Sequence, residues 1–279
     1  MGALLAILAA IAYGVSDFGA GIASRRFAAG PVTAVVEVIG LGTAVLATVL
    51  FGGGRPDRSV LIWGAVSGLG SGVGTLSLYR GLAIGRMSLV ATVAAVLTVV
   101  LPVIAGLVLG HRPAPLAWIG LVSAVPAVGL VSWQSGAGKQ SATRRGLLYG
   151  AAAGAGFGLL FIALHLAGTH AGAWPLIPGL AVSVLLVAPF AIIGLRSVRR
   201  PSAMVVTYML GAGLLGGVGN LLFLASTGRR ELKVVAVLSA MGPAVTVLLA
   251  RLFLAERWTR LQVAGLLLAG GAVILITVG

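Results

Sequence analysis

The sequence predicts an all-α integral membrane protein with ten transmembrane helices, arranged as two inverted repeats of five helices each. Composition, the spacing of apolar runs and an internal duplication support this fold class. Hydrophobic residues make up 59% of the 279 residues and charged residues 9%, whereas about 25% of a typical soluble domain is charged. The mean hydropathy is +1.13. Because a soluble protein needs a largely polar exterior, this composition indicates a polytopic membrane protein.

Ten apolar runs are each long enough to cross a bilayer, which takes about 20 residues of helix. Gly, Pro and Arg residues separate the runs, as expected at helix ends. The first run lacks the basic start and small-residue cleavage site of a signal peptide, so we expect a retained helix. The expected spans are 3–23, 32–52, 60–83, 88–109, 115–133, 147–168, 174–195, 204–226, 232–253 and 258–278.

The second half of the chain repeats the first. Segments 12–23, 70–81 and 109–124 align with 156–167, 215–226 and 254–269, in order and at a nearly constant offset. We therefore expect one repeat at 1–134, a polar connecting loop at 135–146 and a second repeat at 147–279. Because each repeat has an odd number of spans, the second enters the membrane from the opposite side. Inverted repeats of this kind are typical of alternating-access transporters.

Several function classes have no support in the sequence. There are no cysteines, which excludes disulfides and thiolate metal sites. We recognise no catalytic triad, metal-ligand spacing or phosphate-binding loop, so we expect no catalytic residue, no metal and no cofactor. The net charge of +14 lies in short loops between apolar runs. That placement favours contact with lipid headgroups over nucleic-acid binding.

Two related segments, "YRGLAIGRMSLV…LGHR" (79–112) and "MGPAVTVLLARLFLAERWTR…" (241–275), resemble the EamA repeat of the drug/metabolite transporter superfamily. Pro243, Glu256, Arg257 and Gly265 fit the pattern in the second half. In the first half, His111 stands where the helix-end glutamate is expected, and Pro102 lies four residues later than the equivalent of Pro243. The resemblance implies a ten-helix secondary transporter, often an exporter of amino acids, metabolites or drugs.

The resemblance also implies a multi-pass protein of the cell membrane with cytoplasmic termini. The loops on the side opposite the termini carry more Lys and Arg than the loops on the termini side. The positive-inside rule would therefore put the termini outside, and the sequence leaves the orientation open. The expected partners are a small-molecule substrate and the lipid bilayer. Protons are one option for coupling, and the chain would act as a monomer or a homodimer.

Asp17, Glu37 and Arg80 are charged residues inside expected spans, where a charge costs about 2.5–3.5 kcal/mol on insertion scales. Asp17 lies eight residues before Arg25, which places it about 12 Å from that helix end. Glu37 and Arg80 are expected at a similar depth, so one carboxylate could pair with Arg80 and the other could hold a proton or cation. The repeat counterparts are Phe161, about Ala181 and Ala225. A structural role for Asp17, and snorkelling of Glu37 and Arg80 to the interface, remain the alternatives.

Further candidates accompany these charges. The aromatic residues expected to line a substrate pathway are Tyr13, Tyr79, Phe157 and Phe161, although ordinary packing would also place them there. Asn220 and its repeat counterpart Thr75 could bind substrate or join helices by hydrogen bonds. Pro102 and Pro243 are expected to kink helices that move during gating.

The best reading is a secondary active transporter of small metabolites, amino acids or drugs that works by alternating access. A membrane-embedded enzyme acting on lipid is the alternative from another class, with the three charged residues as its only candidate catalytic group. A receptor or scaffold without transport activity is a third reading.

Overall fold

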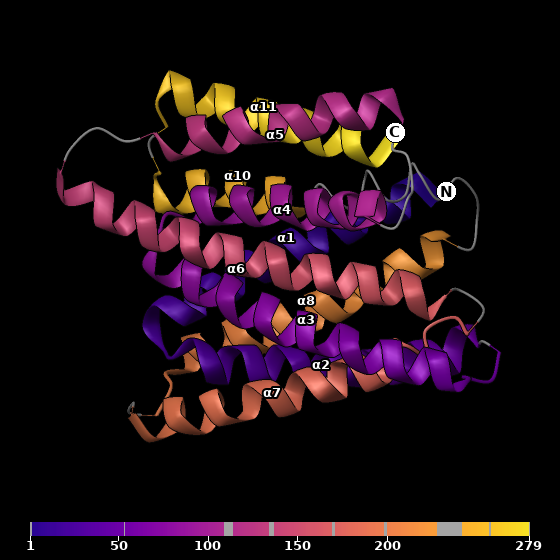
Figure 1. Cartoon of the computed structure of the whole chain (residues 1–279). Coiled ribbons are helices and arrows are strands. Elements are labelled where there is room, and N and C mark those ends of the chain that lie inside the picture. Colours follow the sequence, from indigo (N-terminus) through magenta and orange to yellow (C-terminus); the bar gives the residue numbers. More distant parts are fainter. Residues whose placement is uncertain are drawn as a thin grey trace.

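The computed structural model describes residues 2–52, 54–108, 114–133, 137–168, 171–197, 200–227, 242–256 and 258–278. All regular structure in these ranges is helical (Figure 1). The helices of the first half are α1 (Gly2–Arg26), α2 (Ala29–Phe51), α3 (Arg58–Ile84), α4 (Met87–Val108) and α5 (Pro115–Ser132). Those of the second half are α6 (Ala137–Ala167), α7 (Leu176–Ser197), α8 (Ala203–Thr227), α10 (Gly242–Leu254) and α11 (Arg260–Val278).

Within the described ranges, seven helices are long and apolar enough to span a membrane, namely α1 to α4 and α6 to α8. Shorter apolar helices cover Pro115–Val131, Gly242–Leu254 and Arg260–Ile276. Each of the ten expected spans overlaps one of these helices. Many large apolar side chains remain exposed, including Val49, Val125 and Leu267. Lipid tails can cover such side chains, so their exposure is consistent with a multi-pass membrane protein.

Two details differ from the sequence-based expectation. α6 begins at Ala137, so most of the expected polar loop at 135–146 is helical. Hydropathy detects only the apolar part of a helix, so it does not detect the polar first turns of α6. Residues 232–241 of the ninth expected span, together with His111 and Arg257, lie outside the described residues.

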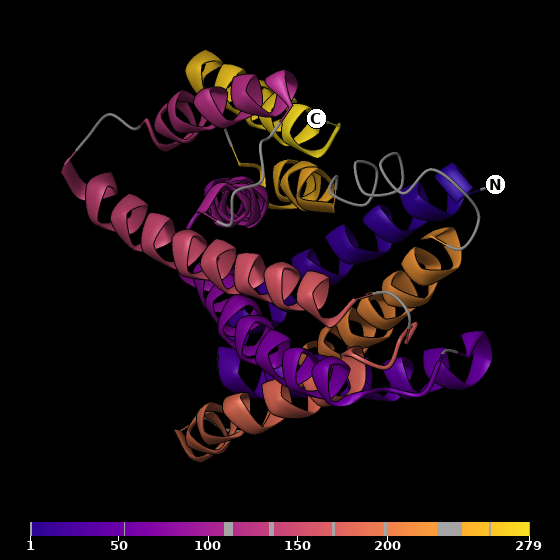
Figure 2. The ribbon, with the colours of Figure 1, turned by 45° about the vertical axis from the view of Figure 1, so that its right-hand side comes forward.

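The two halves pack against each other through matching pairs of helices. α1 packs on α8, and its counterpart α6 packs on α3. α10 packs on α1, and α4 packs in the same way on α6. α2 lies beside α7 at one edge of the bundle, while α5 lies beside α11 at the opposite edge (Figures 1 and 2). Both termini lie at the same end of the bundle (Figure 1).

Close contacts repeat at the residue level. A Cβ added at Gly74 would lie 2.7 Å from the Phe157 ring, and one at Gly219 would lie 2.8 Å from the Tyr13 ring. These residues are repeat counterparts. Glycine lets helix backbones approach closely in a membrane, where small residues dominate helix interfaces. Local packing is therefore duplicated along with the sequence.

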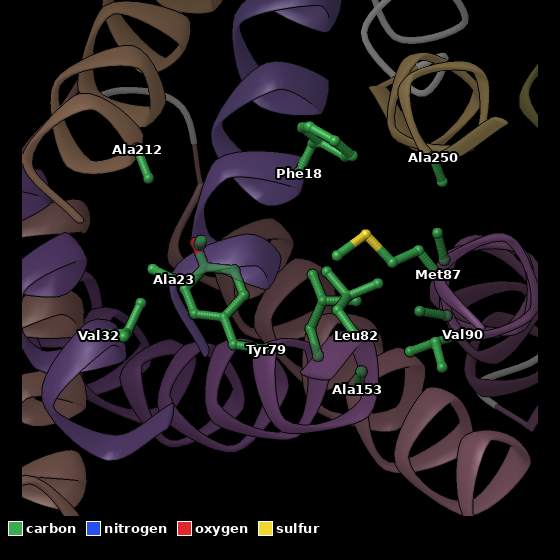
Figure 3. Packing of buried hydrophobic residues seen from close by; sticks show 14 of the residues in the cluster. Phe18, Ala23, Val32, Tyr79, Leu82, Met87, Val90, Ala153, Ala212 and Ala250 are labelled. Atoms are coloured by element: carbon green, nitrogen blue, oxygen red, sulfur yellow. The ribbon is translucent and has the colours of Figure 1, made fainter. Parts of the chain in front are cut away.

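α3 runs through the centre of the bundle. The Asp57 carboxylate caps its N-terminus by accepting a hydrogen bond from the Val60 N–H at 2.8 Å, which satisfies one orphan donor of the first turn. Further along, Tyr79 and Leu82 are almost fully buried. They lie among side chains of α1, α4 and α10 in the main core cluster (Figure 3). The residues drawn and labelled there are Phe18, Ala23, Val32, Tyr79, Leu82, Met87, Val90, Ala153, Ala212 and Ala250.

Candidate functional site

Asp17 lies on α1, on the side of the helix that faces the bundle interior. It interacts electrostatically with the phenol groups of Tyr13, one turn earlier on α1, and of Tyr79 on α3. The Asp17 side chain is half-buried and accepts no hydrogen bond from any residue in the described ranges. A carboxylate in the membrane interior without a hydrogen-bond donor or counter-charge is energetically costly. A cation or a proton would stabilise it.

Tyr13 connects the two halves. Its hydroxyl donates a hydrogen bond of 2.7 Å to Oδ1 of Asn220 on α8. One turn away, the Ser16 hydroxyl donates at 2.7 Å to the backbone carbonyl of Ala212, also on α8. Because Tyr13 uses its proton on Asn220, that proton is not available to Asp17. Tyr13 and Asn220, both expected site residues, are thus in direct contact. This contact fits the alternative in which Asn220 joins helices by a hydrogen bond.

Glu37 on α2 has a very different environment, because hydroxyl groups surround its carboxylate. The side chain is 3% exposed. The Ser71 hydroxyl donates to Glu37 Oε1 at 3.3 Å, and the hydroxyls of Thr75 and Ser183 also face the carboxylate. Ser183, on α7, is fully buried. Its Oγ lies within hydrogen-bonding geometry of no described residue. Its hydroxyl therefore has spare bonding capacity.

The two carboxylates belong to one polar region. Tyr79 is 2% exposed and interacts electrostatically with both Asp17 and Glu37. We call this region the central polar cluster. It consists of Tyr13, Ser16, Asp17, Glu37, Ser71, Thr75, Tyr79, Ser183 and Asn220, which come from α1, α2, α3, α7 and α8. Asp17 and Glu37 are thus linked through Tyr79, and their direct convergence stays a prediction.

Arg80 does not join the cluster, which corrects the expectation of an ion pair. Its side chain is exposed, and no ion pair connects it to Asp17 or Glu37 in the described ranges. Consecutive residues on a helix point about 100° apart, so the burial of Tyr79 turns Arg80 outward. Without Arg80, the described part of the cluster carries two acidic groups and no basic one.

The other candidates take different positions. Phe157 on α6 is half-buried against Gly74 of α3, whereas Phe161 is 50% exposed and does not line the cluster. An apolar ring can face lipid at no cost, so nothing requires its burial. Pro102 lies inside α4. Pro243 is the second described residue of α10. The residues before Gly242 lie outside the described ranges, so the expected kink at Pro243 stays a prediction.

Glu256 forms a contact that sequence reasoning did not identify. It follows α10 in the second half, and its carboxylate caps the N-terminus of α4 in the first half. Oε1 accepts from the Met87 N–H at 2.8 Å. Oε2 accepts from the Ser88 N–H at 3.3 Å and from the Ser88 hydroxyl at 2.5 Å. A negative charge at this position also complements the positive end of the helix dipole.

The neighbours of Glu256 extend this contact. The preceding residue, Ala255, has a φ of 51°, which is the left-handed region that non-glycine residues rarely adopt. On the other side, Arg25 at the end of α1 donates to the carbonyls of Leu82 and Gly85 at 3.0 and 3.2 Å. Arg25 also interacts electrostatically with Glu256. The ends of α1, α3 and α10 and the start of α4 are thereby joined.

Comparison with known proteins identifies the family. The profile of the EamA-like transporter family matches residues 1–133 and again residues 144–278. The chain belongs to the EamA-like transporter family. The two matches coincide with the two repeats, and they confirm the resemblance to the drug/metabolite transporter superfamily. No curated protein matches the sequence.

A solved structure supports the fold of this EamA-like protein. A crystal structure described only as that of a protein superposes with a TM-score of 0.60 over 98% of this chain and 95% of the other. The two sequences are 17% identical, so the similarity concerns the fold alone. The central polar cluster and the Glu256 cap are therefore described from this chain only.

Proposed function

We propose that this EamA-like protein is a secondary active transporter of the cell membrane. It moves a small molecule by alternating access between two inverted five-helix repeats, with the central polar cluster as the binding site. The observation that carries the proposal is the position of Asp17. Its carboxylate lies where the halves meet, beside a hydrogen bond between them, and it has no partner among the described residues.

The packing of the halves supports alternating access. The contacts α1–α8, α1–α10 and α2–α8 have the counterparts α6–α3, α6–α4 and α7–α3 with the halves exchanged. In an inverted duplication, exchanging the conformations of the two halves converts a binding site open to one side of the membrane into one open to the other side. The substrate would then remain near the midplane while the halves rearrange around it. No observation favours an enzyme acting on lipid.

Asp17 also supports coupling to protons. A carboxylate that can be neutralised either by a proton or by a substrate group couples the two, because binding of one disfavours the other. Glu37 is less suited to this role, since three hydroxyl groups already face its carboxylate. We therefore assign proton exchange to Asp17 and a supporting role to Glu37.

The test uses the full chain reconstituted in lipid vesicles that contain a pH-sensitive dye. A panel of amino acids, amines and cationic drugs is added in turn under an imposed pH gradient. We expect at least one compound to cause proton movement with the wild-type protein, and we expect Asp17→Asn to abolish it. The matched control is Asp57→Asn, which removes the same charge outside the site, and asparagine still caps a helix.

Two results would refute the proposal. One is the absence of both proton movement and flux of labelled compound across the whole panel, with correctly folded protein in the vesicles. The other is an Asp17→Asn variant with unchanged flux and unchanged pH dependence. Folding of each variant is checked by its elution as a single species in size-exclusion chromatography and by its thermal unfolding temperature.

A further inference from the structure

We propose that the central polar cluster selects a net positively charged organic amine over the corresponding zwitterionic amino acid or anion. The inference rests on the proposed function and deepens it by naming a substrate class. The protonated amino group would bind at Asp17, and a hydrogen-bond acceptor elsewhere on the same molecule would bind the Asn220 side-chain amide. Four observations lead to this assignment.

The first observation is the charge of the cluster. Asp17 and Glu37 are both acidic, and no basic side chain of the described residues reaches either of them. The arginines on helices packed against α1 point elsewhere: Arg80 on α3 and Arg251 on α10 are exposed. Arg25 on α1 itself is occupied by carbonyls at the end of α3. In a region of low dielectric, this excess of negative charge attracts cations and repels anions strongly.

The second observation is the contrast between the two carboxylates. Three hydroxyl groups face Glu37, and hydrogen bonds to the ionised form stabilise it. Asp17 has no such donors within the described ranges. Its side chain is half-buried, whereas that of Glu37 is almost fully buried. The geometry therefore assigns the ligand's positive group to Asp17.

The third observation concerns unused hydrogen-bonding groups. Asn220 accepts from Tyr13 through Oδ1, and its two amide N–H groups make no bond to any described residue. They are donors, so they suit an acceptor such as a hydroxyl or carbonyl oxygen. These unused donors indicate a site built for a polar molecule.

The fourth observation is the aromatic content. The Tyr13 and Tyr79 phenol groups both lie in electrostatic contact with Asp17. Aromatic faces attract organic ammonium groups, and more strongly once water is excluded. An organic ammonium ion satisfies both the carboxylate and the rings, which a hydrated inorganic cation does not.

An amino acid would bind less well than its amine. Its own carboxylate would enter the same low-dielectric region as Asp17 and Glu37, where like charges repel. The amide of Asn220 is neutral and offsets little of that repulsion. A compound with a blocked amino group and a free carboxylate would meet the repulsion without gaining the contact to Asp17.

The experiment measures binding of two matched triplets to the purified full chain in lipid nanodiscs by calorimetry. One triplet is tyramine, tyrosine and N-acetyltyrosine, and the other is histamine, histidine and N-acetylhistidine. In at least one triplet we expect the amine to bind about tenfold more tightly than the amino acid or better, equivalent to about 1.4 kcal/mol. The acetylated compound should not bind. Asp17→Asn should lose the amine, whereas Asp57→Asn should retain it.

Three results would overturn the inference: an amino acid or acetylated compound that binds as tightly as its amine, no binding of either amine at millimolar concentration, or unchanged amine affinity in folded Asp17→Asn. The wild-type comparison does not depend on any variant folding. Flux separates this inference from the proposed function. Amine binding without flux refutes transport but not selectivity, while flux of an amino acid that ignores Asp17 refutes selectivity but not transport.

Discussion

Replacement of Glu256 should destabilise the whole bundle, because its carboxylate joins the two halves. The first N–H groups of a helix have no partner within the helix, and Glu256 accepts from two of those of α4 as well as from the Ser88 hydroxyl. Loss of a helix cap costs about 0.5–2 kcal/mol, and loss of a favourable charge at a helix start costs about 0.3–1 kcal/mol. We therefore expect Glu256→Ala to lower the free energy of unfolding by about 2 kcal/mol.

Glu256→Gln should have a smaller effect, about half as large, because the amide oxygen can still accept a backbone hydrogen bond while the charge is lost. The measurement is equilibrium unfolding of the purified protein in mixed micelles, followed by loss of helical signal. Ser88→Ala provides the second arm of a double-mutant cycle. Since the Ser88 hydroxyl bonds to Glu256 at 2.5 Å, the two substitutions should be less than additive.

The reasoning would be refuted if Glu256→Ala changed the unfolding free energy by less than about 0.3 kcal/mol, below the lowest expected value for either effect. It would also fail if Glu256 and Ser88 contributed independently. Asp57→Ala is the comparison variant, because Asp57 caps α3 within its own half. Its loss should destabilise the protein without coupling to Ser88.

Three further predictions concern packing and polar contacts. Asn220→Leu removes the acceptor of Tyr13 and should cost about 0.6–1.7 kcal/mol in unfolding experiments, between the mean and the maximum found for interhelical hydrogen bonds in membranes; no loss would show that the bond contributes nothing. Gly68→Ala places a Cβ against the Gly179 carbonyl and should sharply reduce the yield of folded protein. Gly129→Ala should leave the yield unchanged, because the space around Gly129 is open. Equal yields of the two variants would contradict this packing. Ala255→Gly should raise the unfolding temperature, since a left-handed residue other than glycine costs about 1–2 kcal/mol; a lower temperature would argue against strain at this residue.

The positions of the helices could be predicted from the sequence because the bilayer sets their length. Every expected span overlaps a helix, and Asp17 and Glu37 both interact electrostatically with Tyr79. Arg80 shows the limit of that reasoning. Its place in the sequence gives the height along α3, but its direction depends on which face of α3 packs inward, and hydropathy in a uniformly apolar helix does not reveal that face.

Long-range contacts were harder to predict. Glu256 fitted a family pattern, yet nothing near it in the sequence indicates that its partners are Met87 and Ser88 in the other half. The internal duplication does carry information about long-range contacts, which local sequence patterns lack. Because Tyr13 and Phe157 are counterparts, as are Gly219 and Gly74, the contact of one pair predicts the contact of the other. The start of α6 escaped prediction because its first residues are polar.

The Glu256 cap also bears on the resting state of the empty protein. If the two halves were identical in sequence, two conformations related by exchange of the halves would have the same free energy. The residue aligned with Glu256 is His111, which has no carboxylate to offer. A difference of about 2 kcal/mol corresponds to roughly thirtyfold in population at equilibrium. If the Glu256 cap formed in only one of two such conformations, this single unmatched side chain would be enough to favour that conformation.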